Sequence, residues 1–376
     1  MKIAFYSNYL NHHQLPFCEA LYEKYGEDFH FVACTPFNSL RKSLGYRDMN
    51  HEYPFVVRAY ENTEQCSLAL SLATESDIVI YGSAPYVFLK NRLEETDKIT
   101  FVYSERILRK GRWHAVSPKA RKSIFNRYGR YKNKPLYLLC SGAFVRMDYI
   151  LLGAFYNKTF KWGYFPGTKR YDIDRLVGQK EPFSILWVGR FLKLKHPEKA
   201  LKVAKSLKKD GFNFKLSFIG NGPLEDELKS LSQEYGLQSN VEFLGSMSPE
   251  KVREHMEKSQ IFLFTSDKGE GWGAVLNEAM NSGCAVIADK HIGAAPFLIE
   301  DGKNGFLYSG CVLELYKKTK FLLENADISS NLGKNAYKTI TEEWNAQKAA
   351  ERIILLAEHL INLKETPYKT GPCSKN

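Results

Sequence analysis

The sequence has no long apolar run and no closely spaced pair of cysteines. No segment approaches the roughly 18 consecutive apolar residues that a membrane-spanning helix requires, which excludes a protein anchored by such a helix. The first residues resemble a short strand that reaches Asn8, and not the apolar core of a secretory signal. The seven cysteines form no CxxC pair and are odd in number, so we predict neither a disulfide framework nor a zinc site. We therefore expect a cytoplasmic protein with reduced thiols, either soluble or peripheral to a membrane.

Low-complexity segments, short internal repeats, a phosphate-binding P-loop and a serine nucleophile elbow are also missing. What is present is the composition of an ordinary globular protein. Of the 376 residues, 44% are hydrophobic and 25% are charged, which argues against wholesale disorder. At about 150 residues per domain, this length predicts two domains with full-sized cores.

Acidic residues are missing from one long stretch of the chain. Residues 106–147 contain twelve basic residues and no acidic one. The net charge of +11 belongs to the same half, because residues 1–180 contain 27 basic and 17 acidic residues whereas residues 181–376 contain 26 and 25. The positive charge is therefore one patch, and we expect an anionic partner there.

Short apolar, β-branched or aromatic runs alternate with longer amphipathic stretches. Several runs are apolar at consecutive positions, which is typical of parallel strands with helices on both faces. The predicted strands are Lys2–Ser7, His30–Ala33, Ile78–Tyr81, Ile99–Tyr103, Leu136–Cys140, Ser184–Val188, Lys215–Ile219, Val241–Leu244, Ile261–Phe264 and Ala285–Ala288. The predicted helices include Leu15–Tyr25, Pro197–Lys209, Pro223–Tyr235, Pro249–Lys258 and a final helix over Thr341–Leu363.

The alternation of strand and helix runs twice, with a polar break that is rich in glycine and proline between the two runs. This pattern predicts an α/β protein of two doubly wound domains. We predict the first domain over residues 1–165, a linker over 166–182, the second domain over 183–345, and a C-terminal helix and tail over 346–376. The polar tail from Thr366 is expected to fray.

The most informative segment is 261–283. An apolar run precedes a loop with three glycines, Gly269, Gly271 and Gly273, and a helix is expected to open near Ala274. Glycines let a ligand approach the backbone, and the free N–H groups of a helix start favour an anion such as a diphosphate. Glu278 falls among apolar residues of that helix, where a carboxylate needs hydroxyl or cationic partners. The alternative is an ordinary helix start with a surface glutamate.

Glu270 and Glu278 are separated by seven residues and resemble the E-x7-E signature of glycosyltransferase family 4. Four further segments agree with that family in order and spacing, and they read VGRFLKLK (188–195), FIGNGP (218–223), VEFLG (241–245) and EDGKNGFL (300–307). The resemblance is strong over residues 183–310 and elsewhere concerns the layout alone. One departure is GAAPF at 293–297, where many members carry Gly-Gly-x-x-Glu, so the contact usually given to that glutamate is in doubt.

The resemblance implies the GT-B fold, in which two Rossmann-like domains face a cleft and a C-terminal helix crosses back. It also implies a retaining, metal-independent transfer of a hexose or N-acetylhexosamine from a UDP- or GDP-sugar, without a cofactor. Arg190 and Lys195 would hold the donor diphosphate, since fixed cations can neutralise the departing charge. Glu270 would contact the transferred sugar. The implied donor-binding set is Arg190, Lys195, Gly220, Gly222, Leu244, Met247, Glu270, Gly271, Trp272, Gly273, Ala274, Val275 and Glu278, with Glu278 on the ribose hydroxyls.

The first domain would bind the acceptor, which by the same resemblance is a glycan or a lipid-linked sugar. The loop Asn11–Gln14, which contains His12 and His13, follows the first predicted strand. Its polar side chains would contact the acceptor or the donor phosphate, cap the next helix or lie on the surface; a metal site would need further ligands. Glu105 also follows a strand and is a candidate catalytic residue, although members of the family typically carry histidine in this region. His114 is the nearby alternative.

Two further patterns have competing interpretations. Asp172 and Asp174 spell the DxD motif of a different glycosyltransferase fold, but they follow no strand, and we predict no metal site. The segment 117–131 places five basic residues around an apolar face, which suits a helix on an anionic membrane surface at the inner side of the cell membrane. These residues are Lys119, Arg121, Lys122, Arg127 and Arg130. The alternatives are a solvated helix packed on its own domain, or nucleic-acid binding, which we do not favour.

The leading hypothesis is therefore a glycosyltransferase of the kind that builds bacterial surface polysaccharides, with Glu270, Arg190, Lys195 and Glu105 at its reaction centre. The rival hypotheses are a GT-B nucleotide-sugar epimerase or phosphorylase, and a non-catalytic protein that binds a nucleotide-sugar. The products formed from the donor alone would distinguish the first rival from the leading hypothesis.

Overall fold

A computed structural model describes residues 1–37 and 47–376 of the chain. The described residues form two compact units, and the first of them contains both ends of the chain. The first unit consists of Met1–Gly167 and Asn345–Asn376, and the second consists of Thr168–Trp344. Residues 168–182, which we expected in a linker, belong to the second unit, where α7 (Ile173–Gly178) packs against α14 (Ala326–Lys338).

The first unit is built on a seven-stranded parallel sheet. Its strand order is β3-β2-β1-β4-β5-β6-β7. The chain therefore starts in the middle of the sheet, adds strands on one side of β1 and then adds the remaining strands on the other side, beginning with β4. The strands are β1 (Ile3–Ser7), β2 (Phe29–Ala33), β3 (Val56–Arg58), β4 (Ile78–Tyr81), β5 (Thr100–Ser104), β6 (Leu136–Ser141) and β7 (Thr159–Trp162). Every residue of β1 and β4 is buried, as expected for central strands covered on both faces.

The described helices of the first unit connect successive strands, except for the last one, which follows the second unit. They are α1 (Leu15–Tyr25), α3 (Thr63–Glu75), α4 (Tyr86–Glu95), α5 (Pro118–Arg127), α6 (Val145–Leu151) and α15 (Ala346–Ile361). Asn62 and Ser117 cap α3 and α5 by accepting hydrogen bonds from backbone N–H groups, which explains where these two helices begin.

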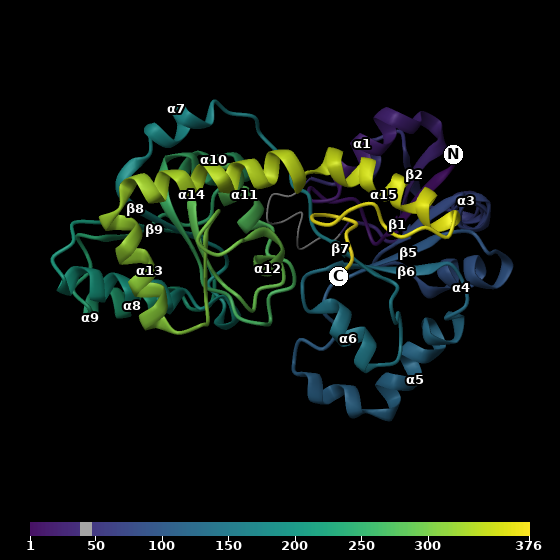
Figure 1. Cartoon of the computed structure of the whole chain (residues 1–376), viewed down its shortest axis with the longest axis horizontal. Helices are drawn as coiled ribbons and strands as arrows, with labels where there is room; N and C mark the ends of the chain where they lie inside the picture. Colours follow the sequence, from purple (N-terminus) through teal and green to yellow (C-terminus); the bar gives the residue numbers. More distant parts are fainter. Residues whose placement is uncertain (38–46) are drawn as a thin grey trace. The chain divides into compact units, whose positions relative to one another are not determined.

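The C-terminal segment returns to the first unit. Asn345 caps α15 by accepting from the N–H of Lys348, and α15 packs along α1 (Figure 1). Beyond it, the backbone of Lys161 in β7 exchanges hydrogen bonds with Cys373 and Ser374, both of which are fully buried. The expectation of a frayed tail is therefore wrong at the very end of the chain, because these residues pair with the edge of the sheet.

The second unit repeats the same strand order with six parallel strands. The order is β10-β9-β8-β11-β12-β13, and the reversal lies between β8 and β11. The strands are β8 (Glu181–Val188), β9 (Lys215–Ile219), β10 (Val241–Phe243), β11 (Ser259–Phe264), β12 (Ala285–Asp289) and β13 (Phe306–Tyr308). The helices are α7, α8 (Pro197–Lys209), α9 (Glu225–Glu234), α10 (Pro249–Lys258), α11 (Val275–Asn281), α12 (Ala295–Leu298), α13 (Val312–Glu324) and α14.

The predicted fold class of two doubly wound α/β units is confirmed, with three strands added. The sequence reading missed β3, β7 and β13, which have only three or four residues each and leave little periodicity to detect. The predicted final helix is interrupted: a single π turn covers Thr339–Glu343, and Trp344 is buried before Asn345 starts α15.

Candidate functional site

In the second unit, the ends of β8 and β11 meet where the strand order reverses. In open parallel sheets, ligands bind beyond the carboxyl ends of the strands at this position. Thr265 joins the two loops, because its hydroxyl donates to the carbonyl of Lys195 at 2.7 Å and accepts from the indole N–H of Trp187 at 2.8 Å. The N–H of Asp267 donates to the carbonyl of Leu194 at 2.9 Å. The two loops are therefore held together by backbone and by buried side chains.

Lys195 and Glu270 form an ion pair across these loops. Lys195 ends a 3-10 turn (Lys193–Lys195) after β8, and Glu270 lies in the glycine loop after β11. Their side chains are 17% and 14% exposed, and the ammonium also lies 5.9 Å from the centre of the Phe264 ring. The structure thus brings together two residues that the sequence analysis selected separately, 75 positions apart.

The backbone next to this pair is held in an unusual conformation. His196 follows Lys195 with a left-handed φ of +49°, and its ring nitrogens contact Glu198 at 2.8 Å and Asp267 at 3.2 Å. Asp267 in turn accepts a hydrogen bond from the N–H of Gly269 at 2.7 Å. His196 therefore links the Lys195 turn to the loop that carries Glu270, and strained residues of this kind are common at functional sites.

The glycines of FIGNGP are required by packing. Gly220 and Gly222 have φ values of +134° and +152°, and a Cβ on either would overlap the backbone of residues 189–191. The N–H of Gly220 also donates to the carbonyl of Gly245 at 2.8 Å. This turn therefore lies directly against the Arg190 segment, and the half-buried Leu244 and Met247 lie just beyond the neighbouring strand β10.

The side chains at the start of α11 are partly withdrawn from solvent. Trp272 is fully buried, donates to Asn277 at 2.8 Å and packs with Phe297 and Trp344, so a role for its ring in binding a ligand is excluded. Phe297 occupies the position where many members of the resembled family carry glutamate, and here it stacks on Trp344. The part of this segment that can face a ligand is the backbone from Gly273 to Val275, which is half-buried.

Glu278 is half-buried on α11, and no described residue forms a hydrogen bond with its carboxylate. Burial raises its pKa above the ordinary value of 4.5, and Arg253 partly opposes this shift. Arg253 itself donates to the backbone carbonyl of Glu278 and to Asn281. Arg190 is exposed, and within the described ranges its guanidinium has no ion-pair partner. Both side chains have unused hydrogen-bonding capacity.

The DxD pattern has a structural explanation. Asp172 caps α7 by accepting from the N–H of Arg175, and Asp174 pairs with Lys334 at 2.6 Å. Within residues 1–37 and 47–376, no group of three or more His, Cys, Asp or Glu side chains is arranged to hold a metal ion.

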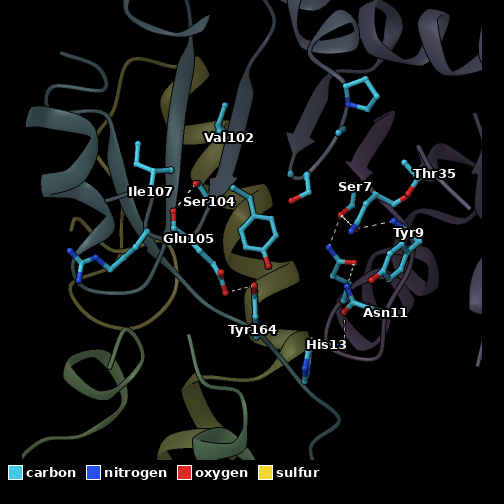
Figure 2. Close-up of a pocket in the computed structure, with 18 of the residues that line it drawn as sticks. Ser7, Tyr9, Asn11, His13, Thr35, Val102, Ser104, Glu105, Ile107 and Tyr164 are labelled. Atoms are coloured by element: carbon cyan, nitrogen blue, oxygen red, sulfur yellow. Dashed lines mark hydrogen bonds between the residues drawn. The ribbon is translucent and has the colours of Figure 1, made fainter. Parts of the chain in front are cut away.

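In the first unit, the carboxyl ends of β1, β4 and β5 surround a cavity of about 690 Å³ (Figure 2). Amide and hydroxyl side chains form one wall, where Asn11 donates to Gln14 at 2.7 Å and Gln14 donates to Ser7 at 3.1 Å. Ser7 in turn lies 3.2 Å from Asn8. The loop Asn11–Gln14 was predicted as a ligand contact from its position after the first strand, whereas Ser7 and Asn8 were not singled out.

Glu105 lies on the opposite wall of this cavity, and both of its carboxylate oxygens have partners. Arg109 donates to one oxygen, and the hydroxyl of Tyr164 donates to the other at 2.6 Å (Figure 2). Burial raises the pKa of the Tyr164 phenol well above its ordinary value, with nearby Tyr103 and Glu105 adding to the shift, so it remains a donor at neutral pH. Glu105 is therefore held in place and charge-compensated.

Of the three candidate histidines, one lines the cavity. His13 lines the cavity and stacks on Tyr164, with ring centres 5.6 Å apart. The ring of His12 packs beside that of His13 but is not part of the lining. His114 stacks on the exposed Trp113 and likewise does not line the cavity.

The five basic residues around α5 do not form one face. Arg121 donates to the carbonyl of Ala115, Arg130 pairs with Glu94, and Arg127 lines the cavity. The prediction that all five lie on a common surface is therefore wrong for Arg127, because the 117–131 segment ends its helix at that residue and continues as a 3-10 turn. Lys119 and Lys122 are exposed. No helix in the described part of the chain is long and apolar enough to cross a membrane.

Comparison with known proteins agrees with this description of the second unit. Residues 170–339 match the family model described as glycosyl transferases group 1. That segment spans a little under half of the chain and contains Arg190, Lys195, Glu270 and Glu278.

Two curated relatives each match over part of the chain. The uncharacterized glycosyltransferase MJ1069 of Methanocaldococcus jannaschii is 31% identical over 185 residues, which cover 49% of this chain and 47% of that protein. The putative colanic acid biosynthesis glycosyltransferase WcaL of Escherichia coli is 32% identical over 143 residues, which cover 37% of this chain and 35% of that protein. The chain thus matches less than half the length of either relative.

A solved structure resembles the whole chain. Alr3699/HepE of Anabaena, crystallised in complex with UDP, has a TM-score of 0.68 at 18% identity, and the alignment covers 96% of this chain and 100% of that one. Together with the two parallel sheets, this likeness identifies the fold as GT-B.

Proposed function

We propose that this protein is a retaining, metal-independent glycosyltransferase of family 4 that moves a hexose or N-acetylhexosamine from a UDP-sugar to a glycan or lipid-linked acceptor. The observation that supports it best is the buried Lys195–Glu270 pair at the strand ends of the unit that matches the glycosyltransferase model. UDP is the favoured nucleotide because HepE was crystallised with it, whereas the sequence alone left UDP and GDP open.

In the proposed mechanism, Lys195 and Arg190 bind the donor diphosphate. Lys195 is fixed by its turn and its pairing with Glu270, whereas Arg190 is exposed and can close on the ligand. Fixed cations stabilise negative charge as it develops on the leaving group, which is the larger part of catalysis in many transferases. Glu270 and Glu278 are acceptors for hydroxyl groups of the sugar and the ribose, and the backbone at Gly273–Val275 adds N–H donors.

The chemical step that follows from this arrangement is a front-side displacement. The bond between the anomeric carbon and the diphosphate breaks, the acceptor oxygen bonds to the same face of that carbon, and its proton passes to the leaving phosphate oxygen. Glu105 lies in the other unit with both oxygens occupied, so we assign it to holding the acceptor wall and not to accepting the proton.

Replacement of the lysine tests the donor site. Lys195→Ala should lower transfer from a UDP-sugar by a factor of about 100 or more, because one preorganised charge contact is lost. Lys193→Ala is the matched control, since Lys193 lies in the same turn but is exposed and has no ion-pair partner among the described residues. Full activity of Lys195→Ala would refute the assignment. An epimer formed from the donor alone would favour the epimerase hypothesis instead.

The proposal includes peripheral membrane binding, but through a smaller surface than the five basic residues predicted from the sequence. Trp113, Val116 and Phe125 are 68%, 74% and 55% exposed, and they flank the exposed Lys119 and Lys122. Aromatic side chains beside lysines suit the surface of an anionic bilayer. Meanwhile Ile124 packs inward on a small core of Leu108, Ala115 and Leu152, so part of the segment also stabilises its own unit.

Co-sedimentation with vesicles tests this surface. Phe125→Ser should weaken binding to vesicles containing phosphatidylglycerol, whereas Phe183→Ser, which removes an exposed phenylalanine of the second unit, should not. Binding that is equal for neutral and anionic vesicles would contradict the proposal, because the lysines would then contribute nothing.

A further inference from the structure

The charges around the cavity of the first unit do not balance. Three arginines line it, namely Arg106, Arg109 and Arg127. Arg106 pairs with the buried Asp148 at 3.2 Å, and Arg109 pairs with Glu105. No carboxylate in the described ranges pairs with Arg127, so one guanidinium of the lining has no counter-charge.

Arg127 is nevertheless held in place. Its guanidinium lies 5.2 Å from the ring centre of Tyr86 and 5.7 Å from that of Tyr128, and it is within hydrogen-bonding reach of the Tyr81 hydroxyl. Its Nε is buried, and no described group accepts a hydrogen bond from it. This nitrogen is covered by protein, so a ligand would meet the rest of the side chain, which is half-buried and lines the cavity.

The other lining groups suit the polyhydroxylated part of a sugar. Amide and hydroxyl groups of Asn8, Asn11, Gln14 and Ser7 form one wall, and Tyr103, Tyr149 and Tyr164 line the other side. The rings of Tyr86 and Tyr128 attract the guanidinium of Arg127, but neither they nor the amides carry a negative charge that would cancel its charge. The excess positive charge must be met by the ligand or by solvent ions.

We propose that this cavity takes an acceptor sugar carrying an anionic group, a carboxylate or a phosphate monoester, and that Arg127 binds this group. The inference rests on the proposed function, in which the first unit holds the acceptor. Guanidinium groups favour both anions because two parallel N–H donors match two oxygens. Arg127 is then the residue that selects a charged acceptor over a neutral one.

Binding of three small probes to the UDP-saturated full-length protein tests the proposal. The probes are methyl glucuronide, glucose 6-phosphate and methyl glucoside, which carry a carboxylate, a phosphate and no charge. Isothermal titration should show that at least one anionic probe binds about tenfold more tightly than the neutral one. Whichever anionic probe binds more tightly identifies the preferred group.

Substitution of Arg127 connects the preference to this residue. Arg127→Met should remove the preference, and Arg127→Lys should keep part of it, because lysine retains the charge but not the paired donors. Arg130→Met is the control, since Arg130 pairs with Glu94 and does not line the cavity. Melting curves of each variant check that it is folded.

The outcomes separate this inference from the proposed function. Equal binding of charged and neutral probes, no binding of either anionic probe, or an unchanged preference in folded Arg127→Met would overturn the inference. In each of these cases, binding of UDP that depends on Lys195 leaves the proposed function standing. If the anionic probes bind through Arg127 but UDP does not bind, the proposed donor site fails and the anion site remains.

Discussion

The two units share a strand order and a cation that binds carbonyls at the amino ends of the strands, but they differ at the carboxyl ends of the strands. In the first unit, Arg92 donates to the carbonyls of Ala73, Ser76, Asp77 and Ile99, at the end of α3 and the starts of β4 and β5. In the second, the ammonium of Lys180 contacts the carbonyls of Met256, Glu257, Ser259 and Ser282 in the corresponding place. Each cation satisfies the last carbonyls of a helix.

At the carboxyl edge the units diverge. In the second unit the loops after the strands pack tightly. Gly220 and Gly222 lie against the backbone of residues 189–191, and the Lys195–Glu270 pair joins the loops after β8 and β11. The first leaves a cavity of about 690 Å³ lined by polar side chains. The two units are thus alike at the amino ends of their strands, where the cation stabilises the fold. They differ at the carboxyl ends, where the proposed function places the donor in one unit and the acceptor in the other.

The largest expected effect comes from removing these two cations. Arg92 is fully buried, and its pKa is lowered to about 10 by burial, so it stays charged at neutral pH. Arg92→Met should lower the free energy of unfolding by about 3–5 kcal/mol, because several carbonyls lose their donors. Lys180→Met should cost less, about 1–3 kcal/mol, since Lys180 is only half-buried and water can replace it.

Hydrogen exchange measured by mass spectrometry can follow each unit separately. Faster exchange should appear in β4 and β5 of Arg92→Met and in β11 of Lys180→Met. Lys90→Met is the control, because Lys90 lies on the same helix as Arg92 and makes one exposed pair with Glu94. If Arg92→Met and Lys180→Met lower the free energy of unfolding equally, the burial of the cation does not decide how much it stabilises its unit.

Much of the fold and part of the candidate site could be predicted from the sequence. The features that could not be predicted depend on tertiary packing. Strands such as Ile78–Tyr81 and Ile261–Phe264 were predictable because both faces are buried. Lys195 and Glu270 were selected because their motifs resemble those of glycosyltransferase family 4 in order and spacing. Arg127 was misassigned to the surface because helical periodicity cannot show that the helix ends there. The roles of Arg92 and Lys180 were missed because a basic residue that binds only backbone leaves no pattern of paired charges.

The next largest effect compares the tightly packed loops at the carboxyl ends of the second sheet with the loops that line the cavity of the first unit. Gly220→Ala should lower the free energy of unfolding by about 3 kcal/mol or more, because the new Cβ meets the carbonyl of Gly189 and the backbone is left-handed. Gly82→Ala, at the end of β4 beside the cavity, should cost about 1 kcal/mol, since its φ is ordinary and the nearest atoms lie at 3.1 Å. Urea denaturation measures both.

Gly245→Ala distinguishes strain from collision in that measurement. Gly245 has a φ of +71° but no atom within 4 Å of a Cβ, so alanine there adds only the backbone cost of about 1–2 kcal/mol. If Gly220→Ala is no worse than Gly245→Ala, the loops of the second unit are less tightly packed than the contacts indicate.

The smallest effect concerns the two glutamates at the edges. Glu105 has two partners, whereas Glu278 has none for its carboxylate among the described residues. Because burial raises the pKa of Glu278, its contribution to stability is complete below pH 4.5 and is lost as the pH rises through the raised value. At pH 7, Glu278→Gln should therefore raise the melting temperature by a few degrees, at about 2–4 °C per kcal/mol.

Glu105→Gln should have the opposite sign, because it weakens the pairing with Arg109. The gain in Glu278→Gln should disappear at pH 4, where the wild-type carboxyl is protonated as well. It should also come with weaker stabilisation by UDP, since in the proposed donor site this carboxylate accepts from the ribose hydroxyls. A melting temperature that falls in Glu278→Gln at pH 7 would mean that this carboxylate already has a partner. Glu278 and Glu105 would then both be paired.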